Sequence, residues 1–160
     1  MLGIEPSVVL TYRDEYPEIL MNDDLNFNVM LPQEFLLEQL HLLQSHRPRE
    51  SETFSLLGHC MEKTGASASQ TQWLEIFQAL GQELNLIEVG CCGMAGTYGH
   101  ETENFEESKG IYKMSWQKHC RGDSSLGNQL LVSGFSCRSQ IERFENFRPL
   151  HPIQALNQMI

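Results

Sequence analysis

Cysteine is the residue type with the most chemistry to offer in this sequence. The chain has five: Cys60, Cys91, Cys92, Cys120 and Cys137. Adjacent cysteines form only a strained disulfide with each other, so a structural bridge does not explain the pair. The odd count fits a reducing compartment, where thiols stay free or bind metal. Thiolates are suitable ligands for zinc and for the iron of iron–sulfur clusters.

Spacing alone leaves the metal-site hypothesis open. Cys60, Cys91, Cys92 and Cys137 do not follow the paired C-x-x-C pattern of a zinc ribbon. Cysteine is also among the most buried residue types and often only fills space in a core. Cys120 lies in a polar stretch and follows no predicted strand, so we interpret it as an ordinary free thiol.

Four short apolar runs predict β-strands. They are Val8–Tyr12, Thr53–Leu57, Leu86–Val89 and Leu130–Ser133. Between and around them, apolar residues at helical spacing predict the helices Gln33–Gln44, Thr71–Leu84, Tyr112–His119 and Ile153–Met159.

Strands that alternate with helices predict an α/β fold with an open, mostly parallel sheet flanked by helices. Three of the predicted strands lead into cysteine: Cys60, the Cys91–Cys92 pair, and Cys137. The carboxyl ends of parallel strands meet at one edge of a sheet, where functional groups gather. We therefore expect these four thiols to converge, although they are far apart in the sequence.

The glycines after the cysteine pair, Gly93, Gly96 and Gly99, do not follow the G-x-G-x-x-G dinucleotide fingerprint. We interpret them as a turn that lets the backbone approach a site closely.

Composition excludes several classes of function. The formal net charge of −10 argues against nucleic-acid binding, which needs a surface of Lys and Arg, and against anionic membranes. No apolar run approaches the ~20 residues of a transmembrane helix. The N-terminus lacks the basic and apolar segments of a secretory signal. These features predict a cytoplasmic protein.

The run Gly90–Gly99, with sequence GCCGMAGTYG, resembles the cysteine-rich "CCG" domain. That domain occurs in heterodisulfide-reductase subunits and in iron–sulfur parts of glycolate and glycerol-3-phosphate dehydrogenases. The chain is most similar to the C-terminal part of bacterial FAD-linked, iron–sulfur D-2-hydroxyglutarate dehydrogenases. Further matching runs are His59–Thr64, Ser108–Tyr112, Gly134–Gln140 and Arg148–Pro152.

The resemblance implies two regions. Residues 1–50 are similar to the tail of a preceding, related lobe, and residues 51–160 to the CCG domain itself. The polar, proline-containing stretch His46–Glu52 would be the boundary.

The family pattern has an early cysteine, the Cys-Cys-Gly run and a late C-x-x-C. Cys60, Cys91, Cys92 and Cys137 take its first four positions, but Gln140 stands at the last. The resemblance thus implies an iron–sulfur cluster or zinc on four thiols. It also implies partner domains elsewhere in a parent chain, one that binds FAD and one that is ferredoxin-like.

Three functions remain as hypotheses. The first is an electron-transfer domain of a FAD-dependent D-2-hydroxy-acid dehydrogenase, in which Cys60, Cys91, Cys92 and Cys137 are the ligands. The second is a zinc-stabilised docking module that transfers no electrons. The third is a thiol redox module that uses the adjacent cysteines. Because the flavin would bind elsewhere, we do not expect the chain alone to oxidise a hydroxy acid.

Overall fold

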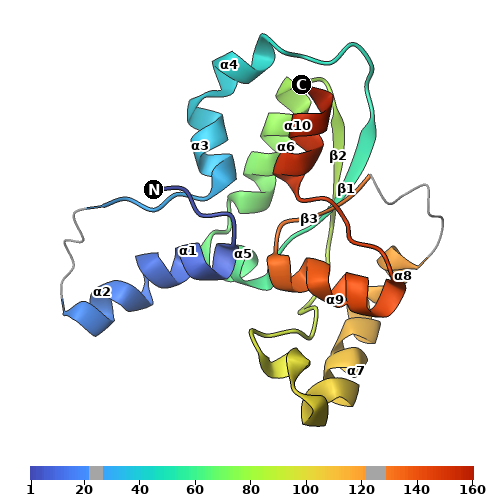
Figure 1. The fold of residues 1–160 in the computed structure, drawn as a ribbon. Helices are drawn as coiled ribbons and strands as arrows, with labels where there is room; N and C mark the ends of the chain where they lie inside the picture. Colours follow the sequence, from blue (N-terminus) through green and yellow to red (C-terminus); the bar gives the residue numbers. More distant parts are fainter. Residues whose placement is uncertain (22–26, 122–128) are drawn as a thin grey trace.

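The computed structural model describes residues 1–21, 27–121 and 129–160 (Figure 1). Its centre is a parallel sheet of three strands, β1 (Thr53–Leu57), β2 (Glu83–Ile87) and β3 (Leu130–Val132), in the order β2-β1-β3. Residue Thr53 pairs with Glu83, and Ser55 pairs with Leu130. The predicted α/β fold with an open parallel sheet is therefore confirmed.

The other elements of the described chain are helices. Before the sheet come α1 (Pro6–Arg13), α2 (Glu15–Leu20), α3 (Pro32–Glu38) and α4 (Leu40–Gln44). Between β1 and β2 lie α5 (Cys60–Gly65) and α6 (Ser69–Ala79). The connection from β2 to β3 contains η1 (Tyr98–His100), η2 (Thr102–Asn104), α7 (Phe105–Ser115) and α8 (Gln117–Cys120). After β3 follow α9 (Phe135–Glu145) and α10 (Pro152–Met159).

The two faces of the sheet pack into separate apolar cores, because successive side chains of a strand point to opposite faces. Phe54, Leu56 and Leu131 pack against α6 and α10, which lie side by side in Figure 1. Leu57 and Val132 belong to the other core. The helices complete that second core with Tyr112, Trp116, Cys137 and Ile141.

The predicted strand Val8–Tyr12 is wrong, because these residues lie in α1. Pro6 stands in the first turn of this helix, where a missing N–H does no harm. Val9 is buried beside Val29 and Leu31 in a small core of its own. Tertiary packing thus overrides the β-propensity of the two valines.

The predicted helix Thr71–Leu84 is correct in its apolar face but too long. Helix α6 ends at Ala79, and Leu84 lies in β2. Gly81 has a φ of +76°, which the chain needs to leave the helix. The Gln82 side chain then accepts a 2.8 Å hydrogen bond from the Glu52 N–H, which starts β2 beside β1.

The other predicted elements are confirmed to different extents. Strand Thr53–Leu57 is confirmed, and Leu130–Ser133 is confirmed to within one residue. The predicted helix Gln33–Gln44 is present but broken at Gln39 into α3 and α4. Helix α9 was not predicted, because two of its buried residues, Cys137 and Gln140, give no clear apolar stripe. The remaining strand and helices occur with shifted bounds: Leu86–Val89 as β2, Tyr112–His119 as the end of α7 plus α8, and Ile153–Met159 as α10.

Residues 46–52 contain no helix or strand, as a linker would. The division into regions 1–50 and 51–160 stays a prediction. Within the three described ranges, no helix has both the length and the apolar character needed to cross a membrane.

His151 predicts a pH dependence of stability. Its ring Nδ1 accepts a 3.1 Å hydrogen bond from the Ile153 N–H and so caps α10. Burial, helped by the positive charge of Arg138, lowers the pKa of His151 from 6.5 to about 4. Because the pKa is lower in the folded than in the unfolded protein, the contribution of His151 to stability is fully present above pH 6.5 and is lost as the pH falls towards 4. Over this range the free energy of unfolding falls by about 1.4 kcal/mol per pH unit.

Replacing His151 by asparagine should flatten this slope, because asparagine also caps helices but does not titrate in this range. Urea unfolding at pH 7.5, 6 and 5 measures the difference between the two proteins. Equal slopes for the natural protein and His151→Asn would show that His151 is not the responsible group.

Candidate thiol site

Each predicted ligand lies beyond the carboxyl end of a strand. Cys60 begins α5 after β1, and the Cys91–Cys92 pair lies in the loop after β2. Cys137 stands in the first turn of α9, directly after β3. Cys60 and Cys91 are partly buried, and Cys92 and Cys137 are buried. All four are free cysteines.

The four thiols are near neighbours in the series Cys60, Cys91, Cys92 and Cys137. Cys60 and Cys92 both influence the pKa of Cys91, and Cys137 influences the pKa of Cys92. Cys60 is also close enough to Cys137 to be affected by its charge. The structure thus brings together the four cysteines that the sequence analysis selected.

The neighbouring thiols differ in acidity. The thiols of Cys60 and then Cys92 lower the pKa of Cys91, against the effect of burial. The Gly93 N–H donates a 3.3 Å hydrogen bond to the Cys91 sulfur. The thiol of Cys91 raises the pKa of Cys60, and that of Cys137 raises the pKa of Cys92. Cys91 is therefore the thiol most easily ionised in this series.

Helix α7 holds the cysteine loop at both ends. The Trp116 indole N–H donates a 2.9 Å hydrogen bond to the Gly90 carbonyl, and the Gly90 N–H donates one of 3.1 Å to Ser115 Oγ. Further along, Ser108 Oγ donates a 2.8 Å hydrogen bond to the Gly93 carbonyl. The loop turns at Gly93, where φ is +87° and a Cβ would lie 2.3 Å from the Ser108 carbonyl oxygen. The glycine turn therefore serves a close backbone approach.

Gln140 fixes the loop from the side of α9. It is fully buried, and its amide nitrogen donates hydrogen bonds to the Cys92 carbonyl at 3.0 Å and to Ser108 Oγ at 2.7 Å. In the sequence, Gln140 stands out only as the position where the family pattern has a cysteine. Its role as a link between α7, α9 and the loop depends on contacts with residues that are 32 and 48 positions away in the sequence, and no sequence pattern indicates such contacts.

A cavity of about 470 Å³ opens beside the thiols. Cys60, Cys91 and Cys92 line it, together with Met61 and the exposed Phe135. The other lining residues are Glu5, Ser7, Thr11, His59, Ala95, Gly96 and Ser136. Three of the four candidate ligands therefore lie at the wall of this cavity.

His59 lies at this site as a helix cap. Its ring Nδ1 accepts a 3.2 Å hydrogen bond from the Met61 N–H, and its Nε2 lies 3.4 Å from Ser136 Oγ and 3.7 Å from Glu5 Oε1. Both ring nitrogens thus have neighbours that orient the imidazole.

The donor type fits a thiophilic metal, because four free thiols are soft ligands. Their placement is not that of a preformed ion site. Among residues 1–21, 27–121 and 129–160, no three His, Cys, Asp or Glu side chains are arranged to hold a metal ion as they stand. A metal would have to replace the protons of these thiols.

Cys120 does not belong to this series. It is buried at the end of α8, and burial raises the pKa of its thiol to about 11. The Tyr112 hydroxyl lies near enough to influence that pKa. It is a free thiol, as the sequence analysis interpreted it.

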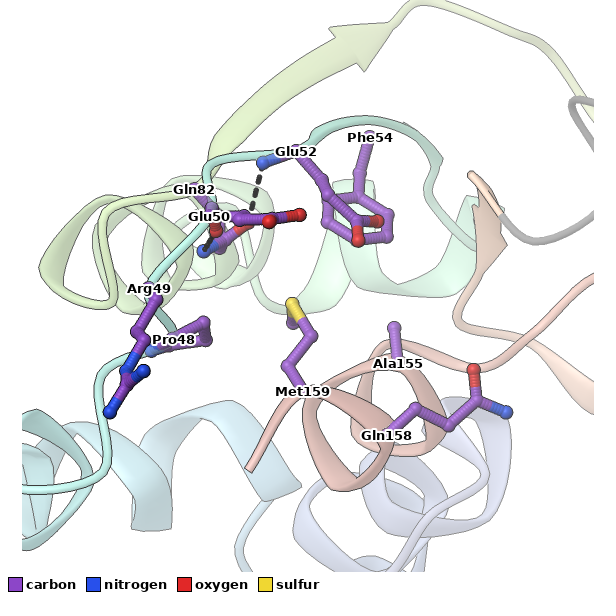
Figure 2. Close-up of a pocket in the computed structure, with 9 residues that line it drawn as sticks. All are labelled: Pro48, Arg49, Glu50, Glu52, Phe54, Gln82, Ala155, Gln158 and Met159. Atoms are coloured by element: carbon purple, nitrogen blue, oxygen red, sulfur yellow. Dashed lines mark hydrogen bonds between the residues drawn. The ribbon is translucent and has the colours of Figure 1, made fainter.

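A second cavity, of about 490 Å³, lies at the opposite edge of the sheet, before β1 and β2 begin (Figure 2). Figure 2 shows Gln82 bonded to the Glu52 backbone nitrogen, with Met159 of α10 across from them. The cavity is lined by Pro48, Arg49, Glu50, Glu52, Phe54, Gln82, Ala155, Gln158 and Met159. It contains no cysteine, so the candidate chemistry lies at the other edge.

A parallel α/β sheet with four thiols beyond its strand ends defines a cysteine-rich α/β domain. The chain is similar to segments of larger known proteins. D-2-hydroxyglutarate dehydrogenase of Escherichia coli is 43% identical over 160 residues, which are 100% of this chain and 15% of that protein. The protein of the same name from Pantoea ananatis is 44% identical over the same 160 residues.

The chain is thus homologous over its whole length to a segment of D-2-hydroxyglutarate dehydrogenases, which confirms the predicted resemblance. It spans only about 15% of their length. One of the subunits of the anaerobic glycerol-3-phosphate dehydrogenase of Escherichia coli is 31% identical over 166 residues, with 40% of that protein covered. No protein-family model and no solved structure matches the chain.

Proposed function

We propose that this chain is the cysteine-rich domain of a FAD-dependent D-2-hydroxy-acid dehydrogenase, and that it carries a metal or iron–sulfur site for electron transfer. One observation supports the proposal above all others: four free thiols from three strand ends gather as near neighbours at one edge of the sheet. Homology to D-2-hydroxyglutarate dehydrogenases makes D-2-hydroxyglutarate the proposed substrate of the whole protein.

The proposed ligands are Cys60, Cys91, Cys92 and Cys137. A bound iron–sulfur cluster would supply a one-electron redox centre, whereas zinc would supply structural stability alone. The chain's own residues prepare the site. Cys91, whose pKa is lowered, loses its proton most readily, and Cys60, Cys91 and Cys92 line the cavity.

Other parts of a longer protein would supply the remaining chemistry. The homologous segment is about 15% of its relatives, so we propose partner domains that bind FAD and a ferredoxin-like cluster. The hydroxy acid would be oxidised at the flavin, because a cofactor does the difficult chemistry in such enzymes. Free thiols in this number fit a reducing compartment such as the cytoplasm.

Metal analysis of protein purified without oxygen tests this proposal. We expect iron and acid-labile sulfide in stoichiometric amounts, and a visible absorption band that bleaches on reduction. Stoichiometric zinc without a visible band would instead favour the docking module. Absence of both metals, with reversible oxidation of the Cys91–Cys92 pair, would favour the thiol redox module.

A further inference from the structure

We propose that Glu62 is a positioning residue that fixes Cys60 relative to Cys137. Glu62 lies in α5 and is only 1% exposed. Its carboxylate joins the turn that leads from β1 into Cys60 to the turn that leads from β3 into Cys137. The proposal rests on the proposed function only for the metal-binding part of its test.

The carboxylate oxygen Oε2 makes the connection between the two turns. It accepts a 3.0 Å hydrogen bond from the His59 N–H, directly before Cys60. It also accepts a hydrogen bond from Ser133 Oγ, at the end of β3. The His59 N–H lies 3.1 Å from Ser133 Oγ, so the three groups form a closed triangle.

The other oxygen, Oε1, anchors the carboxylate to the body of the protein. It accepts a 2.8 Å hydrogen bond from Ser69 Oγ of α6 and one of 3.3 Å from the Gln33 amide of α3. Gln33 also donates a 2.6 Å hydrogen bond to Ser69. Glu62 thus connects four elements through two oxygen atoms.

A buried carboxylate is costly unless several donors or an opposite charge compensate it. Among the described residues, no ion pair involves Glu62. All of its compensation comes from the hydrogen bonds named above, and two of these end at the turns before the candidate ligands. An apolar residue would fill the same space at lower cost but would leave the direct bond from the His59 N–H to Ser133 Oγ as the remaining named hydrogen bond between the two turns.

The turn before Cys137 also packs directly on the turn before Cys60. A Cβ at Gly134 would lie 2.3 Å from His59 Cδ2 and 3.2 Å from the Cys137 sulfur. The two turns are therefore in van der Waals contact, and a small shift of either one moves a thiol. Glu62 is the buried group that bridges them by hydrogen bonds.

Glu62→Met tests the proposal, because methionine has a similar size and removes every acceptor. Glu75→Met is the matched control, since Glu75 is exposed on α6. We measure the alkylation rates of Cys60 and Cys137 by mass spectrometry in metal-free, reduced protein, each relative to Cys120 at the end of α8. Global unfolding exposes all the thiols, whereas a loss of positioning changes only these two ratios.

Glu62→Met should raise both ratios about tenfold, the fold-change that corresponds to losing one hydrogen bond to a charged group. It should also weaken Co²⁺ binding by about 10–100-fold, as loss of an outer partner of a metal ligand does. Glu62→Gln, which keeps one acceptor oxygen, should fall between Glu62→Met and the natural protein. Unchanged ratios in folded Glu62→Met would overturn the proposal.

Ser133→Ala decides the question if Glu62→Met does not fold. It removes one of the bonds to Oε2 and should raise the Cys137 ratio alone, while an unchanged Cys137 ratio would overturn the proposal. The proposed function fails separately: a natural protein that binds no Co²⁺ contradicts the metal site, but the alkylation ratios still decide the role of Glu62.

Discussion

Replacing Cys92 by serine should weaken metal binding by more than about 100-fold, beyond the roughly 10–100-fold effect of losing an outer partner. Cys92 lies in the middle of the thiol series, between its neighbours Cys91 and Cys137. A serine hydroxyl is a hard oxygen ligand and a poor replacement for a thiolate on zinc or iron. Competition against a chelator of known affinity, in reduced and oxygen-free protein, gives the binding constant.

Cys120→Ser is the matched control for this experiment. Cys120 is buried like Cys92 but lies at the end of α8, near Tyr112. Its replacement should leave the metal content and the binding constant unchanged. Metal binding that survives in Cys92→Ser and is lost in Cys120→Ser would contradict the assignment of ligands.

Gly93→Ala should lower the free energy of unfolding by roughly 3 kcal/mol. A left-handed conformation costs a non-glycine residue about 1–2 kcal/mol, and overpacking adds about 1–3 kcal/mol. At Gly93 φ is +87°, and the new Cβ would lie 2.3 Å from the Ser108 carbonyl oxygen, which is backbone and cannot rotate away. Because the turn follows Cys92 directly, the thiol series should be displaced as well.

Gly96→Ala separates backbone strain from this close contact. Gly96 also has a positive φ, of +66°, but no atom lies within 4 Å of a Cβ built there. Its replacement should cost only about 1 kcal/mol. Urea unfolding measures both variants, and equal losses for Gly93→Ala and Gly96→Ala would show that the contact with Ser108 is unimportant.

The sequence predicts the part of this site that depends on the rule for parallel sheets. Apolar runs place β1 and β3 almost correctly, and parallel strands bring their carboxyl ends to one edge. The convergence of Cys60, the Cys91–Cys92 pair and Cys137 follows from that rule. It needs neither the exact ends of the helices nor the detailed packing of the cores.

The order of the thiols could not be predicted, because it depends on side-chain contacts between distant segments. Nothing in the spacing indicates that Cys91 bridges Cys60 and Cys92. The supporting residues were missed for the same reason. Glu62 and Gln140 are polar residues, which sequence patterns assign to the surface, yet both are buried and bound across tens of residues.

Local propensity failed where a helix depends on few apolar residues. The two valines of α1 favour a strand by their propensity, although Val9 lies on the buried side of a helix and packs against Val29 and Leu31. Helix α9 gave no signal, because its buried side includes Cys137 and Gln140. Both helices line the thiol cavity, α1 through Ser7 and α9 through Phe135, so these two incorrect predictions concern elements close to the site.

X-ray absorption at the metal edge of the loaded protein tests the central claim most directly, namely that Cys60, Cys91, Cys92 and Cys137 form one metal site. Sulfur and nitrogen or oxygen neighbours are distinguished by distance, since zinc–sulfur bonds are about 2.3 Å and zinc–nitrogen bonds about 2.0–2.1 Å. We predict a first shell composed of sulfur alone, which loses sulfur in Cys92→Ser and stays intact in Cys120→Ser. A first shell of nitrogen and oxygen, or one that is unchanged in Cys92→Ser, would contradict the claim.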